Sequence, residues 1–178
     1  RYIAIIGQIL AISIVFYYLK LPFPIIESYL IISLGLATNL YLQFFIKINQ
    51  LEDLYAAPFL LIDLLQLSAL LYLTGGIFNP FSFLLVIPAI VSSTFLSMGT
   101  TIILGLITSL LLLTISFFHL PLPGEDMNLL NFPNFYKIGI IISILIGLIF
   151  LSYFGIRFSG EKKKTEEAFK KLQEVIYK

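Results

Sequence analysis

Residues 54–81 read LYAAPFLLIDLLQLSALLYLTGGIFNPF, and this stretch decides the fold. About the first 20 of these residues form an almost unbroken apolar run, the length that a helix needs to cross a bilayer. Gly75 and Gly76 then end that helix, because glycine takes up a left-handed backbone without steric cost. Asn79 is a favoured N-cap and Pro80 a favoured first helical residue, so another helix begins at once. The stretch predicts two membrane-spanning helices joined by a short turn.

The composition of the whole chain indicates a membrane protein. Apolar residues make up 59% of it, charged residues only 12%, and the mean hydropathy is +1.01. A soluble domain cannot keep so much apolar side chain away from water. The 178 residues suffice for about six spans, which leaves no space for a soluble catalytic domain.

Two residue counts limit the chemistry that the chain can perform. It contains no cysteine, which excludes a disulfide, a redox-active thiol and a thiolate metal site. It contains one histidine, His119, and a single imidazole does not make a histidine metal site. We therefore expect no metal in this chain.

Charged and turn-forming residues divide the chain into six apolar segments. We expect membrane spans at residues 2–19, 25–46, 54–74, 80–98, 100–118 and 137–158. The fourth and fifth spans have no charged residue between them, and we place their boundary at Gly99. The longest loop, residues 119–136, contains three prolines, two acidic residues and three asparagines. The fold class predicted is an all-α, six-transmembrane-helix bundle.

Basic residues are distributed unevenly between the two predicted membrane faces. One face carries Arg1, Lys47, Arg157 and three lysines at 162–164, whereas the other carries only Lys20 and Lys137. Since cytoplasmic loops are rich in lysine and arginine, we expect both termini in the cytoplasm.

The last 20 residues differ in character from the six-span domain at residues 1–158. In this tail, residues 159–178, Phe169, Leu172 and Ile176 are spaced three and four apart among charged residues. The spacing predicts the first turns of a parallel dimeric coiled coil that would carry a signal out of the membrane domain. A short amphipathic helix lying on anionic lipid is the alternative.

Polar residues inside the third span are candidates for function. Asp63 lies near its middle, where a carboxylate costs about 2.5–3.5 kcal/mol on insertion scales. Gln66 is one turn further along on the same face. Asp63 can act as a proton-linked or ligand-contacting carboxyl, or, in its protonated form, it can clamp helices together by hydrogen bonds to Gln8, Asn39 or Gln43 of neighbouring spans.

The turn between the third and fourth spans can also form a binding site. N–H groups at the start of the fourth span are expected to be unpaired donors near the membrane interface. Phe78 and Phe81 lie on either side of them in sequence. A quinone ring would pack against such aromatic faces, and its carbonyl oxygens would accept hydrogen bonds. Reduction converts those oxygens into hydroxyls, which also donate hydrogen bonds. A site that offers mainly N–H donors would therefore favour the oxidised ligand, by about 1–2 kcal/mol for one hydroxyl left without an acceptor.

The residues around this turn resemble a known family. DLLQL at 63–67 is followed by LLYLTGGIFNPF at 70–81, with RY at 1–2, GQ at 7–8 and FHLPLP at 118–123. This pattern is similar to the membrane domain of the RegB/PrrB redox-responsive sensor histidine kinases, whose signature GGxxNPF lies between the third and fourth of six spans. The resemblance covers spans one, three, four and five.

The resemblance implies a ubiquinone-sensing input domain in a bacterial inner membrane. It implies a homodimer that signals through a cytoplasmic kinase domain, with ATP and a response regulator engaged only there and no direct contact with nucleic acid. These 178 residues would not be an enzyme by themselves and would have no catalytic residue. The candidate quinone-binding residues are Gly75, Gly76, Phe78, Asn79, Pro80 and Phe81, with Asp63 and Gln66 as supporting residues behind them.

Two other classes of function are considered. A small transporter or channel predicts paired discontinuous helices or several inward charges, whereas Asp63 is the clear intramembrane charge here. A membrane enzyme acting on prenyl or lipid substrates needs clustered carboxylates to hold a metal, for which Glu125 and Asp126 are poorly placed. We therefore favour the sensor.

Overall fold

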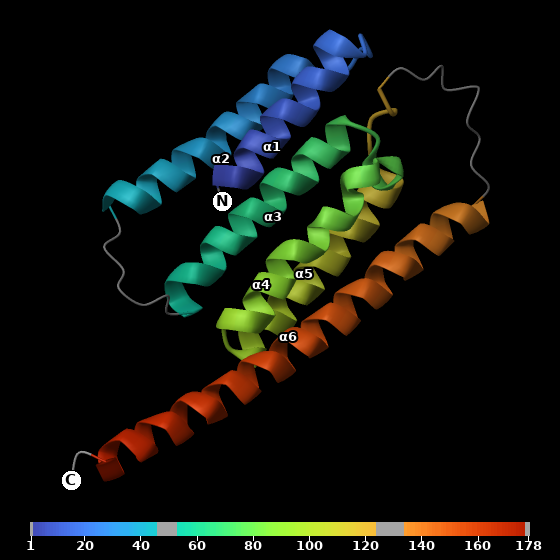
Figure 1. Ribbon diagram of the computed structural model, residues 1–178. Coiled ribbons are helices and arrows are strands. Elements are labelled where there is room, and N and C mark those ends of the chain that lie inside the picture. Colours follow the sequence, from blue (N-terminus) through green and yellow to red (C-terminus); the bar gives the residue numbers. More distant parts are fainter. Residues whose placement is uncertain (1, 46–52, 124–133, 177–178) are drawn as a thin grey trace.

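The computed structural model describes residues 2–45, 53–123 and 134–176, and all regular structure in them is helical (Figure 1). The elements are α1 (Tyr2–Ser13), the π-helix η1 (Ile14–Tyr18), α2 (Ile25–Phe45), α3 (Asp53–Leu73), the 3₁₀ helices η2 (Gly76–Phe78) and η3 (Pro80–Val86), α4 (Ile87–Phe95), α5 (Met98–Phe117) and α6 (Asn134–Ile176). Consecutive helices run in opposite directions, so both ends of the chain lie at the same end of the bundle (Figure 1).

Four of these helices are long and apolar enough to cross a membrane: Ile25–Phe44, Ala56–Leu73, Met98–Phe117 and Asn134–Glu161. Two shorter apolar helical stretches, Tyr2–Tyr18 and Pro80–Phe95, run alongside them. The all-helical, multi-pass character predicted from composition is therefore confirmed. The count of six spans stays a prediction, because it depends on the two shorter stretches.

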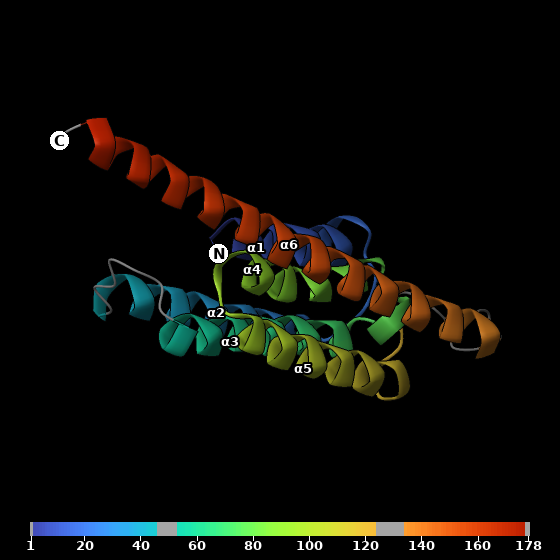
Figure 2. The same ribbon diagram turned by 90° about the horizontal axis from the view of Figure 1, so that it is seen from below.

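The helices form two layers (Figure 2). One layer contains α2, α3 and α5, and the other contains α1, α4 and α6. The chief contacts join α1 to α2, α2 to α3, α3 to α5, and α4 to both α5 and α6. In the second layer, α1 packs against α2 of the first layer. Helix α4 packs against α5 of the first layer and against its neighbour α6.

Two clusters of buried apolar side chains match this division. The larger one joins α3, η2, η3, α4, α5 and α6, with Leu64, Leu85 and Leu112 completely buried. The smaller one joins α1 and α2 to α3 through Ile5, Ile12, Ile32 and Leu70. The two clusters therefore meet at α3, where the larger one includes Leu64 and Leu71 and the smaller one includes Leu70.

Small residues bring several helices into close contact. A Cβ atom added to Gly35 of α2 would collide with the side-chain amide of Gln66 in α3. A Cβ atom added to Gly155 of α6 would collide with Ser93 Oγ of α4. Such small-residue contacts are typical of membrane helix pairs, whose association depends on close van der Waals packing.

The boundary between the fourth and fifth spans differs from the prediction. The chain turns at Leu96 and Ser97, and Ser97 caps α5 by accepting a hydrogen bond from the Thr100 backbone N–H at 3.3 Å. Gly99, where we expected the break, lies inside the first turn of α5. The prediction was wrong because the Ser97 side chain caps the helix start, which stabilises it more than glycine does.

The predicted tail continues the last span without a break, since α6 extends from Asn134 to Ile176. A coiled coil there stays a prediction. Arg1, Lys47, Glu125, Asp126, much of the loop at 119–136 and the last two residues of the tail lie outside the described residues.

Candidate functional site

The turn at the end of α3 depends on two glycines. Gly75 and Gly76 have φ angles of 108° and 58°, in the left-handed region that favours glycine. A Cβ atom at Gly75 would collide with Leu122, and one at Gly76 would collide with Ile115 and His119 at the end of α5. Both glycines are buried. They allow the turn to form and the chain that follows α5 to lie against it.

Asn79 connects the end of α3 to the start of η3 through its side-chain amide. Its Oδ1 accepts a hydrogen bond from the Phe81 backbone N–H at 2.9 Å. Its Nδ2 donates to Thr74 Oγ1 at 2.7 Å and to the Thr74 carbonyl oxygen at 3.1 Å. The predicted roles of Asn79 as N-cap and of Pro80 as first helical residue are confirmed.

The backbone donors at the start of the fourth span are occupied by the protein itself. The Asn79 N–H donates to Gly76 O at 3.2 Å and the Ser82 N–H to Asn79 O at 2.9 Å. Phe81 N–H is used by the cap, and Pro80 has no N–H. The expectation of unpaired N–H groups was therefore wrong for these positions, because the short 3₁₀ turns and the Asn79 cap use them.

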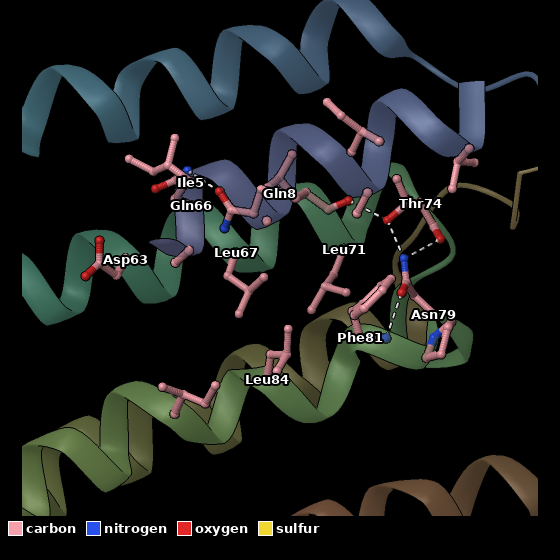
Figure 3. A pocket seen from close by; sticks show the side chains of 18 of the residues that line it. Ile5, Gln8, Asp63, Gln66, Leu67, Leu71, Thr74, Asn79, Phe81 and Leu84 are labelled. Carbon is pink, nitrogen blue, oxygen red and sulfur yellow. Dashed lines mark hydrogen bonds between the residues drawn. The ribbon is translucent and has the colours of Figure 1, made fainter. Parts of the chain in front are cut away.

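A cavity of about 740 Å³ lies next to this turn, between α1 on one side and η3 and α4 on the other. Residues of α3 form its floor (Figure 3). It is lined by Ala4, Ile5, Gly7, Gln8, Ala11, Ile12, Val15, Leu21, Phe23, Asn39, Leu60, Asp63, Gln66, Leu67, Leu70, Leu71, Thr74, Asn79, Pro80, Phe81, Leu84, Ile87, Pro88, Val91 and Pro123. Phe81 and Ile87 are each 47% exposed, so the cavity opens at the surface of the helix bundle.

The structure divides the predicted site residues into two groups. Asn79, Pro80, Phe81, Asp63 and Gln66 all line the cavity. The cavity thus brings together three residues of the turn with the two polar residues of the third span.

The other three candidates lie outside the cavity lining. Gly75 and Gly76 are buried in the turn. Phe78 packs edge to face with His119 at 5.7 Å between ring centroids, and Lys137 Nζ lies 6.0 Å from the Phe78 ring. These residues support the turn from the side of α5 and α6.

The polar side chains of α3 also connect helices. Gln66 Nε2 donates to Gln8 Oε1 of α1 at 3.0 Å. On the other side, Gln66 packs over Gly35 of α2. Tyr2 OH donates to Gln43 Oε1 at 2.6 Å and links α1 directly to α2. Gln66 therefore links α3 to α1 and lines the cavity as well, while both alternatives for Asp63 stay predictions.

Sequence reasoning missed one wall of the cavity. Ala4, Gly7, Gln8 and Ala11 share one face of α1 and leave room beside α4. Ala4, Gly7 and Ala11, spaced three and four residues apart, form a small-residue stripe that is visible in the sequence. The opposing wall comes from Leu84, Ile87, Pro88 and Val91 of η3 and α4.

The cavity suits an apolar molecule with a small polar group. Its volume falls within the range of about 300–1,000 Å³ that is typical of small-molecule sites. Its lining is mainly aliphatic and aromatic, with polar side chains at two places (Figure 3). Gln8, Asp63 and Gln66 lie toward one end, and Thr74 and Asn79 toward the other.

Comparison with known proteins agrees with the resemblance seen in the turn. The chain is 34% identical over 177 residues to the sensor histidine kinase RegB of Cereibacter sphaeroides. The matched region covers 99% of this chain but 38% of RegB, so the chain spans well under half the length of that relative. It is a homologue of the N-terminal part of RegB. No family model and no solved structure matches the chain.

Proposed function

We propose that this homologue of the RegB membrane region is the input region of a two-component sensor histidine kinase, and that it binds a quinone in the cavity between α1 and α4. The observation that carries the proposal is that Asn79, Pro80 and Phe81 of the GGxxNPF turn line that cavity. Quinone occupancy would report the redox state of the respiratory chain. The activity itself would reside in a cytoplasmic kinase domain that uses ATP and phosphorylates a response regulator.

The properties of the cavity support a quinone as its occupant. Phe81 offers an aromatic ring at the rim, against which a quinone ring can stack at an offset. The aliphatic side chains of α1 and α4 can accommodate the start of a prenyl chain. Because the rim residues are exposed among lipid-facing side chains, a quinone dissolved in the bilayer could enter from the side.

The membrane arrangement belongs to the same proposal. Six spans with both termini in the cytoplasm would agree with the alternating helix directions in Figure 1 and with the distribution of lysine and arginine. We place the protein in a bacterial inner membrane as a homodimer whose subunits meet in the coiled coil.

Helix packing suggests how occupancy reaches the kinase. The cavity wall on α4 is also packed against α6, and this is the most extensive helix contact of the described chain. Ser93 of α4 fits against Gly155 of α6. A ligand that moves α4 away from α1 would therefore move α6, whose single helix runs on to Ile176.

A tryptophan placed at the rim of the cavity tests the proposal. The chain contains no tryptophan, so Ile87→Trp introduces a single reporter at the cavity. The purified variant in lipid nanodiscs should show saturable quenching of its fluorescence by ubiquinone-1. A matched control is Ile103→Trp on α5, which is 59% exposed and lies outside the cavity lining. It should show only the linear quenching caused by quinone dissolved in lipid. Equal quenching at both positions would contradict a site in this cavity.

A further inference from the structure

Gln8 of α1 has a side-chain amide that the protein uses only in part. Its Oε1 accepts a hydrogen bond from Gln66 Nε2 at 3.0 Å. Its own Nε2 has no hydrogen-bond partner among the described residues. The side chain is half-buried and lines the cavity. Since a glutamine nitrogen carries two N–H groups, Gln8 brings donors to the cavity that the described protein leaves without an acceptor.

Close packing between α2 and α3 determines the direction of this amide. The Gln66 amide lies against Gly35 of α2, and its oxygen is the atom nearest to the position of a Gly35 Cβ. Contacts between a Cα hydrogen and an oxygen are common where helices pack closely. The Gln66 nitrogen is thereby directed toward α1, where it donates to the Gln8 oxygen. The Gln8 nitrogen must then point away from Gln66, and Figure 3 shows it directed toward Leu67.

The Gln8 nitrogen is open to the cavity. In the described part of the chain, the fully buried side-chain N and O atoms without a hydrogen-bond partner are Asn39 Oδ1 and Ser152 Oγ. Gln8 Nε2 also lacks a partner but is not enclosed in this way, so a molecule in the cavity can reach it. Its neighbours on this wall, Gly7 and Ala11, have no side-chain atom beyond Cβ that could cover it.

The depth of Gln8 in the membrane determines which acceptor can reach it. Gln8 belongs to the apolar stretch Tyr2–Tyr18 and lies about 9 Å along the helix axis from Tyr2. An amide N–H without an acceptor is costly in hydrocarbon, because no water is available there. The ester carbonyls of lipids lie at the membrane interface and not at this depth. A small apolar molecule that carries a carbonyl group into the bilayer can supply the acceptor.

The donors at the turn, in contrast, are already engaged. Both N–H groups of the Asn79 side chain donate to Thr74. The Thr74 hydroxyl donates to the Leu70 carbonyl oxygen at 2.8 Å, and the Phe81 N–H donates to the Asn79 cap. The turn therefore offers a ligand mainly the apolar surfaces of Pro80 and Phe81.

We propose that Gln8 Nε2 donates a hydrogen bond to a carbonyl oxygen of the bound quinone, and that the quinone ring lies over Leu67 and Leu71. This inference rests on the proposed quinone site. In Figure 3 these two leucines form the floor between Gln8 on one wall and Phe81 on the other. They are one turn apart in α3, about 6 Å along the axis, which is close to the length of a six-membered ring with its two oxygens. The N–H donor expected at the turn is thus assigned to the first span.

Infrared spectroscopy of the bound ligand tests this contact directly. A hydrogen bond to a quinone carbonyl lowers its stretching frequency. Ubiquinone-1 with and without an isotope label at its carbonyl carbons gives a difference spectrum free of protein bands. The purified chain is placed in nanodiscs of ether-linked lipid, which has no ester carbonyl.

Two substitutions at Gln8 and one control are compared. Gln8→Met removes the donor at similar length, and Gln8→Leu is the second variant if the first does not fold. The matched control is Tyr2→Phe, which removes a hydrogen bond between α1 and α2 outside the cavity lining.

We expect one carbonyl band of ubiquinone-1 at lower frequency in the wild-type chain than in nanodiscs without protein. Gln8→Met should return this band to its frequency in lipid. It should also raise the ubiquinone-1 concentration needed for half-maximal thermal stabilisation about threefold to tenfold, as the loss of one neutral hydrogen bond predicts. Tyr2→Phe should keep the lowered band and an affinity close to that of wild type.

Other results would overturn the inference in different ways. If ubiquinone-1 bound to the wild-type chain shows both bands at their lipid frequencies, no donor reaches its carbonyls. If the lowered band persists without Gln8, another group binds the carbonyl. If Tyr2→Phe abolishes the band as well, it depends on the packing of α1 and not on the Gln8 amide. The quinone site stands in these cases as long as the wild-type chain binds ubiquinone-1 saturably. Without saturable binding, both proposals fall.

Discussion

The side-chain amide of Asn79 donates to both oxygens of Thr74, to Oγ1 at 2.7 Å and to the carbonyl at 3.1 Å. Thr74 follows the last residue of α3, and Asn79 caps η3, so this pair closes the turn between two membrane helices. The hydrogen bonds hold Pro80 and Phe81 at the cavity while Gly75 and Gly76 pack against the chain after α5. The GGxxNPF motif thus has a structural role in this turn, and through the turn it contributes residues to the cavity lining.

Replacement of Asn79 should therefore affect stability as well as ligand binding. Asn79→Ala removes the cap of η3 and both bonds to Thr74, and we expect a loss of about 1–3 kcal/mol in unfolding free energy. Thermal unfolding of the purified chain measures it. Asn79→Asp, which keeps an acceptor for the Phe81 N–H but cannot donate to Thr74, should lose part of this amount. An Asn79→Ala protein as stable as wild type would contradict the structural role.

The contact between Gly35 and Gln66 predicts a strong effect of a single methyl group. Gly35→Ala places a Cβ against the Gln66 amide, and such overpacking costs about 1–3 kcal/mol. Gly105→Ala in α5 is the matched control, because a Cβ there meets nothing within 4 Å. It should be neutral or stabilising, since alanine favours helix over glycine. The double variant Gly35→Ala with Gln66→Ala should recover much of the lost stability, and additive effects would argue against the contact.

Filling the cavity from the α1 side should block ligand binding without harming the fold. A side chain at Gly7 has open space, because an added Cβ meets nothing within 4 Å, and Gly7 lines the cavity. Gly7→Leu should raise the ubiquinone-1 concentration needed for half-maximal thermal stabilisation at least tenfold. This corresponds to a loss of about 1.4 kcal/mol in binding free energy. Gly105→Leu, at an open position outside the lining, is the control. Unchanged binding by Gly7→Leu would place the ligand elsewhere.

Sequence alone located the turn at residues 75–80 correctly, because glycine, asparagine and proline act there through local backbone chemistry. The apolar runs of the sequence predicted the positions of the helices equally well. It misplaced the start of α5, since Ser97 and Gly99 both interrupt a run without charges. It could not show that the Asn79 amide is already engaged with Thr74, or that Ala4, Gly7 and Ala11 face α4 across a cavity. These facts depend on packing between residues far apart in sequence.

Transmission to the kinase should depend on the close contact between Gly155 and Ser93. Gly155→Leu would force α6 away from α4 at the end of α4 near the predicted cytoplasmic face, because no space exists there for a Cβ. In the longer protein we expect this variant to bind ubiquinone-1 like wild type but to lose the change in autophosphorylation that the quinone causes. Gly147→Leu, on the same helix with nothing within 4 Å of its added Cβ, is the matched control and should respond normally. If Gly155→Leu still responds, the signal must leave the cavity through α3 and α5, since α4 would then move independently of α6.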